Sequence, residues 1–322
     1  MENILEIKDL NIGFKLEDEF ARAIHGVSLS IEKGKSLGVV GESGCGKSVT
    51  ATSIMRLLPS NAVVESGEIV YDGQNLLKYS EKEMQKVRGN KIVLIPQDPL
   101  TSLNPLYTIG DQISEVIELH HKVSGKEAKN RAIEALRQVN IPEPENRFND
   151  YPHQFSGGMR QRVIIAMALS CNPELIIADE PTTALDVTVQ AQILALIKSI
   201  QDKHNTTLLL ITHDLGVVAE ACDYVAVMYA GRIIEYANVK NIFNNPMHPY
   251  TKGLLESLPL LESSKLKPIN GQPPNINEKI NGCVFHPRCP SKIDICENEE
   301  PEANLVGDSH KVCCHLHKTA IK

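Results

Sequence analysis

The chain of 322 residues lacks three features that would have placed it in other classes of protein. It has no apolar run of about 18 residues, so no transmembrane helix is expected. Its first residues, MENILEIKDLNIGF, lack a basic start followed by an apolar stretch, so we expect no secretory signal. Its formal net charge of −7 argues against a strongly basic nucleic-acid surface. We therefore expect a chain that stays in the reducing cytosol, where structural disulfides are uncommon.

Strand-like and helix-like segments alternate through most of the chain. The apolar run PELIIADEP has the character of a buried strand, and the amphipathic segment QAQILALIKSIQDKHN and a second buried run, TTLLLITHD, follow it. This alternation predicts an α/β fold with a mixed, mostly parallel sheet. Residues from about 98 to 171 have helical periodicity, which predicts a helical subdomain inserted into that fold.

The composition changes at about residue 236. Prolines become frequent, periodicity is lost, and five of the eight cysteines lie in the last forty or so residues. We therefore predict a main domain over residues 1–235 and a small, irregular C-terminal extension over residues 236–322, which does not form a second independent core.

The segment GESGCGKS, Gly41–Ser48, matches the phosphate-binding pattern G-x-x-x-x-G-K-S/T. It follows the strand-like SLGVV and precedes a helical segment, which is the context that the pattern requires. Lys47 can reach the β- and γ-phosphates of a nucleotide, and the Ser48 hydroxyl can bind Mg²⁺. Cys45 occupies a variable position and is interpreted as a small filler, not a nucleophile. The candidate phosphate-binding residues are Gly41, Ser43, Gly44, Cys45, Gly46, Lys47, Ser48 and Val49.

Two acids at the end of LIIADE are predicted to complete the chemistry. Asp179 ends an apolar strand, where a carboxylate can hold Mg²⁺ through water. Glu180 follows and can orient or deprotonate the attacking water. Together with the phosphate loop, these acids indicate hydrolysis of the γ-phosphate of a bound nucleotide.

These motifs resemble those of the ATP-binding subunit of an ABC transporter, a family with a P-loop NTPase fold. The segment FSGGMRQR, Phe155–Arg162, is similar to the signature motif of that family. The resemblance implies that Ser156, Gly157 and Gly158 contact the γ-phosphate of ATP bound to the other subunit, so that dimerisation is part of catalysis. The chain departs from the common pattern with Phe155 for Leu, which keeps an apolar anchor, and Met159 for Gln, which removes an amide.

The resemblance implies roles for further residues. Gln97 in LIPQDP corresponds to the glutamine that senses Mg²⁺, and His213 in LLITHD to the histidine that contacts the γ-phosphate. The segment Ala184 to Asp186 corresponds to the loop that crosses the dimer interface. An aromatic residue stacks on adenine in the family, and Phe14 is the candidate here, with Phe20 as the alternative.

Longer segments, including QDPLTSLNPLYTIGDQI and HPYTKGLLESLP, resemble the branch that imports dipeptides, oligopeptides or nickel. This implies a peripheral ATPase subunit on the cytoplasmic face of the cell membrane, of the dipeptide type first and the oligopeptide type next. The implied partners are a second ATPase subunit (a paralogue or a second copy), two transmembrane permease subunits and a separate extracytoplasmic peptide-binding protein. No nucleic-acid partner is expected. The alternatives are an ABC ATPase acting on ribosomes or DNA, against which the single cassette and the lack of a heptad insert argue, and a redox-sensing ATPase.

Four cysteines of the extension, Cys283, Cys289, Cys296 and Cys314, follow the pattern C-x₅-C-x₆-C-x₁₇-C. They lack the C-x₂-C pairs of zinc ribbons, and their spacing differs from common ferredoxin patterns. Four thiolates suffice for Zn²⁺ or for a 4Fe-4S iron–sulfur cluster, and wide loops between ligands suit the bulkier cluster. The family resemblance also favours the cluster, in a structural role, and favours Cys314 over Cys313 as the last ligand. Zinc, a disulfide and free thiols remain alternatives.

Overall fold

A computed structural model of the chain describes all residues except 1, 18, 184, 259–267, 308 and 318–322. The described residues form two compact units, and the strand β8 (Thr207–Thr212) leads the chain from the first unit into the second. The first unit comprises residues 33–35 and 78–209, and the second comprises residues 2–32, 36–77 and those from 210 onward.

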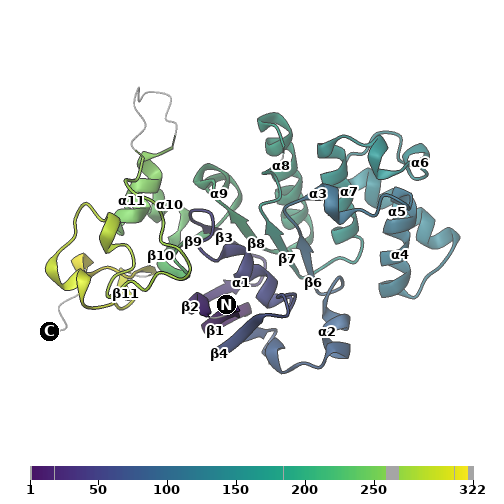
Figure 1. The fold of residues 1–322 in the computed structure, drawn as a ribbon. Coiled ribbons are helices and arrows are strands. Elements are labelled where there is room, and N and C mark those ends of the chain that lie inside the picture. Colours follow the sequence, from purple (N-terminus) through teal and green to yellow (C-terminus); the bar gives the residue numbers. More distant parts are fainter. Residues whose placement is uncertain (1, 18, 184, 259–267, 308, 318–322) are drawn as a thin grey trace. The chain divides into compact units, whose positions relative to one another are not determined.

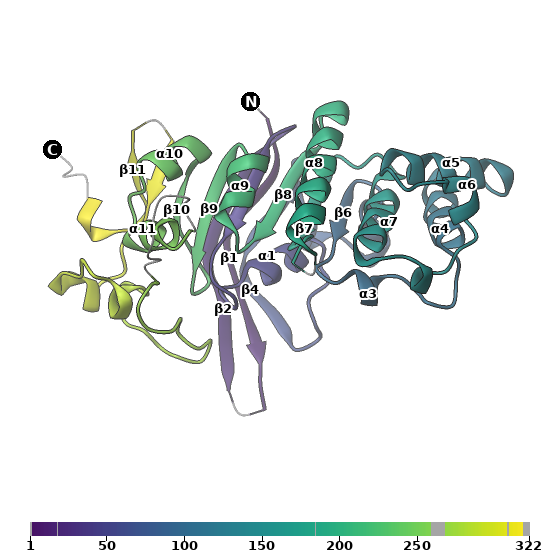
Figure 2. The same cartoon turned by 90° about the horizontal axis from the view of Figure 1, so that it is seen from above.

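One sheet of the second unit is antiparallel. Strand β1 (Asn3–Lys15) pairs on one side with β2 (Phe20–Glu32) and on the other with β4 (Ala62–Tyr71), which in turn pairs with β5 (Gln74–Asn75). Alternate side chains of β1, such as that of Leu5, are buried, as expected for a strand with one face on a core. Figure 2 shows β1, β2 and β4 running beside one another as long strands.

The second sheet of this unit is mixed. Strand β9 (Tyr224–Tyr229) pairs in parallel with β3 (Ser36–Val40) and antiparallel with β10 (Arg232–Asn238). Beyond β10 lie two short antiparallel strands of the C-terminal extension, β12 (His310–Val312) and β11 (Asn304–Val306). The predicted mixed sheet is therefore confirmed, and the extension adds strands to it. The helices of this unit are α1 (Lys47–Ile54), α9 (Leu215–Ala221), α10 (Val239–Asn244) and α11 (Pro249–Glu256).

The extension shares a hydrophobic core with the mixed sheet. Tyr229 of β9, Tyr250 of α11 and Phe285 are all buried, and their ring centroids lie 4.7–5.4 Å apart. Val40 of β3 and Val227 of β9 belong to the same cluster. Three short 3₁₀ turns complete the described extension: η3 (His286–Arg288), η4 (Asp294–Glu297) and η5 (His315–His317).

The first unit combines a parallel strand pair with helices. Strand β6 (Ile92–Ile95) runs parallel to β7 (Leu175–Asp179), so both strands end at the same edge. Helices α4, α5, α6 and α7 gather beside one another in Figure 1. The helices of this unit are α2 (Glu81–Val87), α3 (Pro99–Ser102), α4 (Ile109–His121), α5 (Lys126–Gln138), α6 (Pro144–Arg147), α7 (Gly157–Leu169) and α8 (Val187–His204), with the 3₁₀ turns η1 (Leu76–Lys78) at its border and η2 (Pro152–Gln154).

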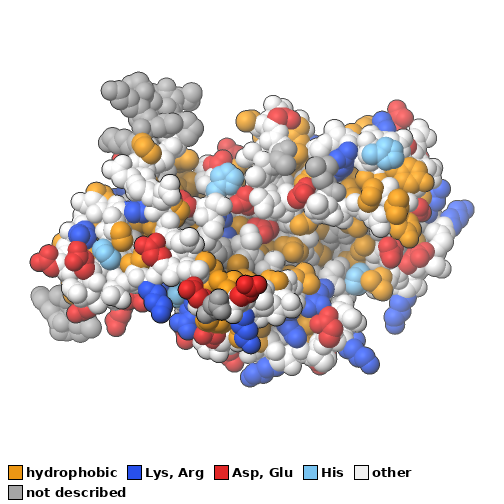
Figure 3. Space-filling model, viewed as in Figure 1, with side chains coloured by type: hydrophobic (Ala, Val, Ile, Leu, Met, Phe, Trp, Pro, Cys, Tyr) orange, Lys and Arg blue, Asp and Glu red, His pale blue; other side chains and the backbone are white. Residues whose placement is uncertain are grey.

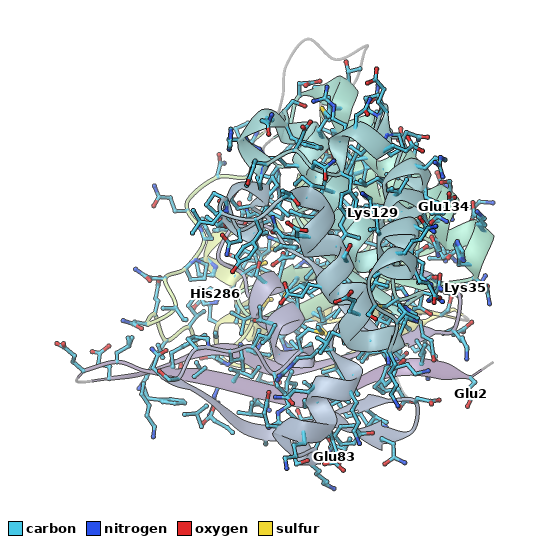
Figure 4. The ribbon with its side chains drawn as sticks, turned by 90° about the vertical axis from the view of Figure 1, so that its right-hand side faces the viewer. Glu2, Lys35, Glu83, Lys129, Glu134 and His286 are labelled. Carbon is cyan, nitrogen blue, oxygen red and sulfur yellow. The ribbon has the colours of Figure 1, made fainter. Side chains whose placement is uncertain are left out.

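Capping side chains define where these helices begin. Ser80 and Glu83 form a reciprocal capping box at the start of α2, and Figure 4 labels Glu83 there. Thr108 caps α4 by accepting a hydrogen bond from the Asp111 N–H. On α5, the Lys129 ammonium lies over the Phe148 ring, 4.9 Å from its centroid. Of these residues, Thr108 caps a helix inside the block from about 98 to 171, whose helical character was predicted from periodicity.

Candidate nucleotide-binding site

The phosphate-binding loop of the second unit connects β3 to α1. Gly46 is the N-cap of α1 with φ 106°, a left-handed conformation that favours glycine. At Gly41, a Cβ atom would lie 2.1 Å from the Met228 carbonyl oxygen, so only glycine allows the loop to pass so close to β9. The loop thus leads into a helix N-terminus, where backbone N–H groups attract anions.

Lys47 and Cys45 are both buried in this loop. The Lys47 Nζ donates hydrogen bonds to the carbonyl oxygens of Gly41 at 2.8 Å and Glu42 at 3.0 Å. Burial raises the pKa of the Cys45 thiol, and its sulfur lies 3.9 Å from the Lys47 Nζ. A thiol kept protonated by burial agrees with the interpretation of Cys45 as a filler. Ser43, Gly44 and Ser48 are exposed, and Val49 is half-buried.

Sequence reasoning missed a contact between this loop and the C-terminal extension. The Glu42 carboxylate accepts hydrogen bonds from the Arg288 guanidinium, at 2.6 Å from Nη1 to Oε2 and 3.0 Å from Nη2 to Oε1. The Glu42 backbone N–H donates to the Tyr250 hydroxyl at 3.0 Å. The segment HPYTKGLLESLP, which contains Tyr250, was interpreted only as a family feature, and Arg288 was given no role, since nothing local to either residue points to a loop more than 200 residues away.

The two candidate aromatics occupy different environments. Phe14 is half-buried within β1, where it pairs with Ala21 and Ala62. Phe20 is 46% exposed and lines a cavity of about 610 Å³ together with Gly44 of the phosphate loop. The structure thus brings Phe20, the alternative, to the phosphate loop and leaves Phe14 inside the sheet. His213 is exposed directly after β8.

The first unit brings Gln97 and Glu180 together at the ends of its parallel strands. Gln97 follows β6, Asp179 ends β7 and is buried, and the Gln97 amide donates to Glu180 Oε2 at 3.1 Å. Thr183 Oγ1 donates to the same carboxylate oxygen at 2.8 Å. Glu180 has φ 46°, a left-handed conformation that costs a non-glycine residue energy and that is frequent at functional sites.

The signature segment contains the start of a helix. The Ser156 hydroxyl caps α7 by accepting from the Met159 N–H at 3.3 Å, and Gly157 and Gly158 form the first turn. A Cβ at Gly158 would lie 2.5 Å from Val189 Cγ1 on α8, so glycine allows these helices to approach closely. Phe155 is buried, which agrees with the expected apolar anchor.

Asp186 also caps a helix. Its Oδ1 accepts a hydrogen bond from the Val189 N–H at 3.0 Å, which fixes the start of α8. Its side chain is exposed, so capping does not bury it. Ala184, the first residue of the predicted interface loop, lies outside the described residues.

Comparison with known proteins identifies the family. Residues 24–183 match the ABC transporter family, and residues 234–296 match the oligopeptide/dipeptide transporter C-terminal region. A probable peptide ABC transporter ATP-binding protein of Sinorhizobium fredii is 51% identical, over 97% of this chain and 94% of that protein. The chain belongs to the ABC transporter ATP-binding subunits of the oligopeptide/dipeptide family.

Two further relatives of this ATP-binding subunit are named for different peptides. An oligopeptide transport ATP-binding protein of Bacillus subtilis is 53% identical, over 96% of this chain and 87% of that protein. A dipeptide transport ATP-binding protein of Escherichia coli is 46% identical, over 97% of this chain and 96% of that protein. The similarity therefore extends through the C-terminal extension in both cases.

Solved structures support the same fold for this ATP-binding subunit. A dimeric ATP-binding cassette in a post-hydrolysis state, bound to ADP and phosphate, superposes with a TM-score of 0.66 at 29% identity. The match covers 73% of this chain and 98% of that cassette. The predicted ABC ATPase fold is confirmed. In the described part of the chain, no helix is both long and apolar enough to cross a membrane.

None of the five cysteines in the C-terminal extension of this ATP-binding subunit forms a disulfide. Cys283, Cys296 and Cys314 are buried and Cys289 is half-buried. Burial above all, together with the charges of Cys296, Cys314 and Cys289, raises the pKa of Cys283 to about 11. Cys313 points elsewhere, since its thiol donates to the Ile233 carbonyl oxygen at 3.4 Å.

The predicted metal site of the extension is not confirmed. Within the described ranges, no group of three or more His, Cys, Asp or Glu side chains is arranged to hold a metal ion. The backbones of two of the predicted ligands do meet, because the Cys283 N–H donates to the Cys296 carbonyl oxygen at 2.8 Å. The disulfide alternative also finds no support, since none of the five cysteines of the extension is joined to another.

Proposed function

We propose that this protein hydrolyses ATP to energise a membrane importer of dipeptides or oligopeptides. The observation that carries the proposal is the identity of 46–53% with peptide transport ATP-binding proteins over 96–97% of the chain. The similarity covers the C-terminal region typical of these transporters as well as the ATPase domain. Neither a ribosome- or DNA-directed ATPase nor a nickel importer is favoured by these relatives.

The phosphate loop binds the nucleotide in this proposal. Lys47 exchanges its bonds to the Gly41 and Glu42 carbonyls for the β- and γ-phosphates. The N–H groups at the start of α1 add positive potential for the same anion. Phe20, which is exposed beside Gly44, stacks on adenine in preference to Phe14.

Glu180 orients the attacking water and accepts its proton. Gln97 and Thr183 hold the Glu180 carboxylate in place through hydrogen bonds to Oε2. His213 donates a hydrogen bond to the γ-phosphate as charge develops there. The family assigns Ser156, Gly157, Gly158 and Asp186 to the nucleotide of a second ATPase subunit, and the exposed start of α7 suits such a contact.

Magnesium is the metal that ATP requires. The residues proposed for it offer oxygen atoms, from the Ser48 hydroxyl, the Asp179 carboxylate and the Gln97 amide, and oxygen donors are what Mg²⁺ prefers. When bound, Mg²⁺ neutralises charge on the phosphates.

The proposed partners are a second ATPase subunit, two membrane-spanning permease subunits and an extracytoplasmic peptide-binding protein. The chain would then be peripheral to the membrane on its cytoplasmic face. Figure 3 shows hydrophobic side chains exposed over the helical part of the first unit. Leu106, Tyr107 and Leu119 of this part are 80%, 57% and 74% exposed, and such a patch suits a protein contact.

We further propose that Cys283, Cys289, Cys296 and Cys314 hold a 4Fe-4S cluster. Support comes from their proximity: the charge of Cys296 raises the pKa of each of the other three thiols, and the charges of Cys289 and Cys314 also raise the pKa of Cys283. Thiolates around a cluster stand further apart than around one ion, which favours iron–sulfur over zinc. The cluster supplies a covalent link across an irregular segment.

A transport assay tests the main proposal. The full chain is co-expressed and purified with permease chains of a peptide importer, reconstituted in vesicles, and supplied with ATP and labelled di- and oligopeptides. We expect peptide-stimulated ATP hydrolysis that Lys47→Ala lowers about a hundredfold or more. Recovery of the chain with ribosomes, without permease chains or peptide uptake, would contradict the proposal.

A further inference from the structure

Glu42 is an acid inside a loop that binds phosphates. The loop attracts anions through its backbone N–H groups and Lys47, so a carboxylate within it repels the triphosphate. The Glu42 side chain is 27% exposed, which means that water screens its charge only in part. The protein therefore requires something that compensates this charge.

Arg288 supplies the compensating charge from the C-terminal extension. Its guanidinium makes a bidentate ion pair with the Glu42 carboxylate, at 2.6 and 3.0 Å, and its side chain is only 6% exposed. Three oxygens hold the guanidinium in place: the carbonyls of Asn270 at 3.0 Å and Gly271 at 3.2 Å and the Tyr229 hydroxyl at 3.4 Å. The N–H groups of Arg288 are thus divided between the Glu42 carboxylate and these three oxygens, which together fix the direction of the guanidinium.

The backbone of Glu42 is held as firmly as its side chain. Its N–H donates to the hydroxyl of the buried Tyr250, and its carbonyl accepts from the Lys47 Nζ. The orientation of this peptide thus determines where Lys47 lies. Glu42, which Tyr250 and Arg288 hold, is therefore also a residue that Lys47 contacts.

We propose that Arg288 is a positioning residue that neutralises Glu42 and orders the phosphate-binding loop for ATP. The inference rests on the proposed function, because it assumes that this loop binds ATP. It assigns the C-terminal extension a direct part in nucleotide affinity. Removal of Arg288 leaves an unpaired carboxylate beside the phosphates, which costs more than the loss of the pair itself.

The test is a double-mutant cycle on the full-length chain. We measure the Kd for Mg-ATP by displacement of a fluorescent ATP analogue from the wild type, Arg288→Ala, Glu42→Gln and the double variant. Arg288→Ala should weaken ATP binding about tenfold. Glu42→Gln removes the carboxylate charge that repels the triphosphate, so the double variant should bind ATP within about twofold of Glu42→Gln alone. A residue that only packs the extension would cause the same loss in both backgrounds.

Two further variants control for folding and charge. Lys292→Ala removes an exposed ion pair with Glu297 in the same extension and should leave ATP affinity unchanged. Arg288→Lys and Arg288→Gln both keep most of the side-chain volume and differ in charge, so Arg288→Lys should bind more tightly even if Arg288→Ala does not fold.

The outcomes separate this inference from the proposed function. Unchanged affinity in Arg288→Ala, or no recovery in the double variant, overturns the role of Arg288 while Lys47→Ala still abolishes binding. A wild-type chain that does not bind Mg-ATP overturns the proposed function and this inference together.

Discussion

His248 is a buried histidine whose surroundings disfavour its charged form. Its ring packs 5.6 Å from the Phe285 ring, and its Nδ1 accepts a hydrogen bond from the Tyr250 N–H at 3.0 Å. Burial lowers the pKa of His248 to about 3, and the nearby His317 contributes in the same direction. The folded protein therefore keeps this ring neutral, whereas the unfolded chain binds a proton below about pH 6.5.

This difference in proton binding between the folded and unfolded states determines how stability changes with pH. The unfolded state binds more protons, so the stability that depends on neutral His248 is complete above about pH 6.5 and is lost as the pH falls toward 3. Between about pH 6.5 and 5.5, this one group should lower the free energy of unfolding by about 1 kcal/mol. His248→Asn keeps a side chain that can cap α11 but does not titrate. The free energy of unfolding of this variant should therefore decrease by about 1 kcal/mol less than that of the wild type between about pH 6.5 and 5.5.

Urea unfolding of the wild type and His248→Asn at several pH values measures this difference. The pKa of His25 is also lowered, to about 4, mainly by burial, so His25 contributes to the pH dependence of both proteins equally. Identical pH dependence in the two proteins would show that His248 is not held neutral in the fold.

At the scale of the element, the C-terminal extension contains two adjacent cysteines, and only one of them is proposed to bind the cluster. Only one of the adjacent thiols, Cys314, lies near Cys289 and Cys296, whereas Cys313 donates to a carbonyl of β10. Cys314→Ser should therefore abolish the proposed cluster, and Cys313→Ser, its matched control, should keep it. Anaerobic purification, iron and sulfide analysis, and absorbance near 400 nm provide the measurement, with about four irons per chain expected.

Other metal contents would change the assignment. About one zinc and no iron per chain would replace the cluster by a single-ion site. Loss of iron in Cys313→Ser with retention in Cys314→Ser would reverse the choice of ligand.

Elements with local signals were predictable from the sequence. The loop at Gly41–Ser48 and the acids at the end of LIIADE were predicted from patterns of neighbouring residues, and the loop indeed connects β3 to α1 while Asp179 ends β7. The mixed sheet followed from alternating segments. The three-residue strands β11 and β12 were missed, because so short a strand has no measurable period.

Contacts distant along the chain could not be predicted. Glu42 and Arg288 are 246 residues apart, and neither has a local feature that points to the other. The choice between Phe14 and Phe20 also required the structure, because both lie near one hairpin end and only the pairing of β1 with β2 fixes which ring is exposed. A single sequence shows which chemical groups such residues have, but it does not show which residues lie next to them in the fold.

At the scale of the whole molecule, the question is whether ATP binding and ATP hydrolysis are separate steps. In the proposed function, the signature motif serves the nucleotide of a second subunit, so two copies, or two paralogues, would associate when ATP is bound. Hydrolysis would then release them. The dimeric cassette that this chain resembles, at a TM-score of 0.66, holds ADP and phosphate, so the fold accommodates such a pairing in that protein.

Glu180→Gln should stop the cycle after ATP binding. The glutamine carbonyl can still accept the bonds that Gln97 and Thr183 donate to Glu180 Oε2, so the local geometry is kept while the base is lost. We expect hydrolysis to fall about a hundredfold or more and a dimer to accumulate with Mg-ATP, as measured by size-exclusion chromatography with light scattering. Glu180→Gln combined with Lys47→Ala, which cannot hold the phosphates, should remain monomeric. Hydrolysis at the wild-type rate by Glu180→Gln would assign the base to another residue.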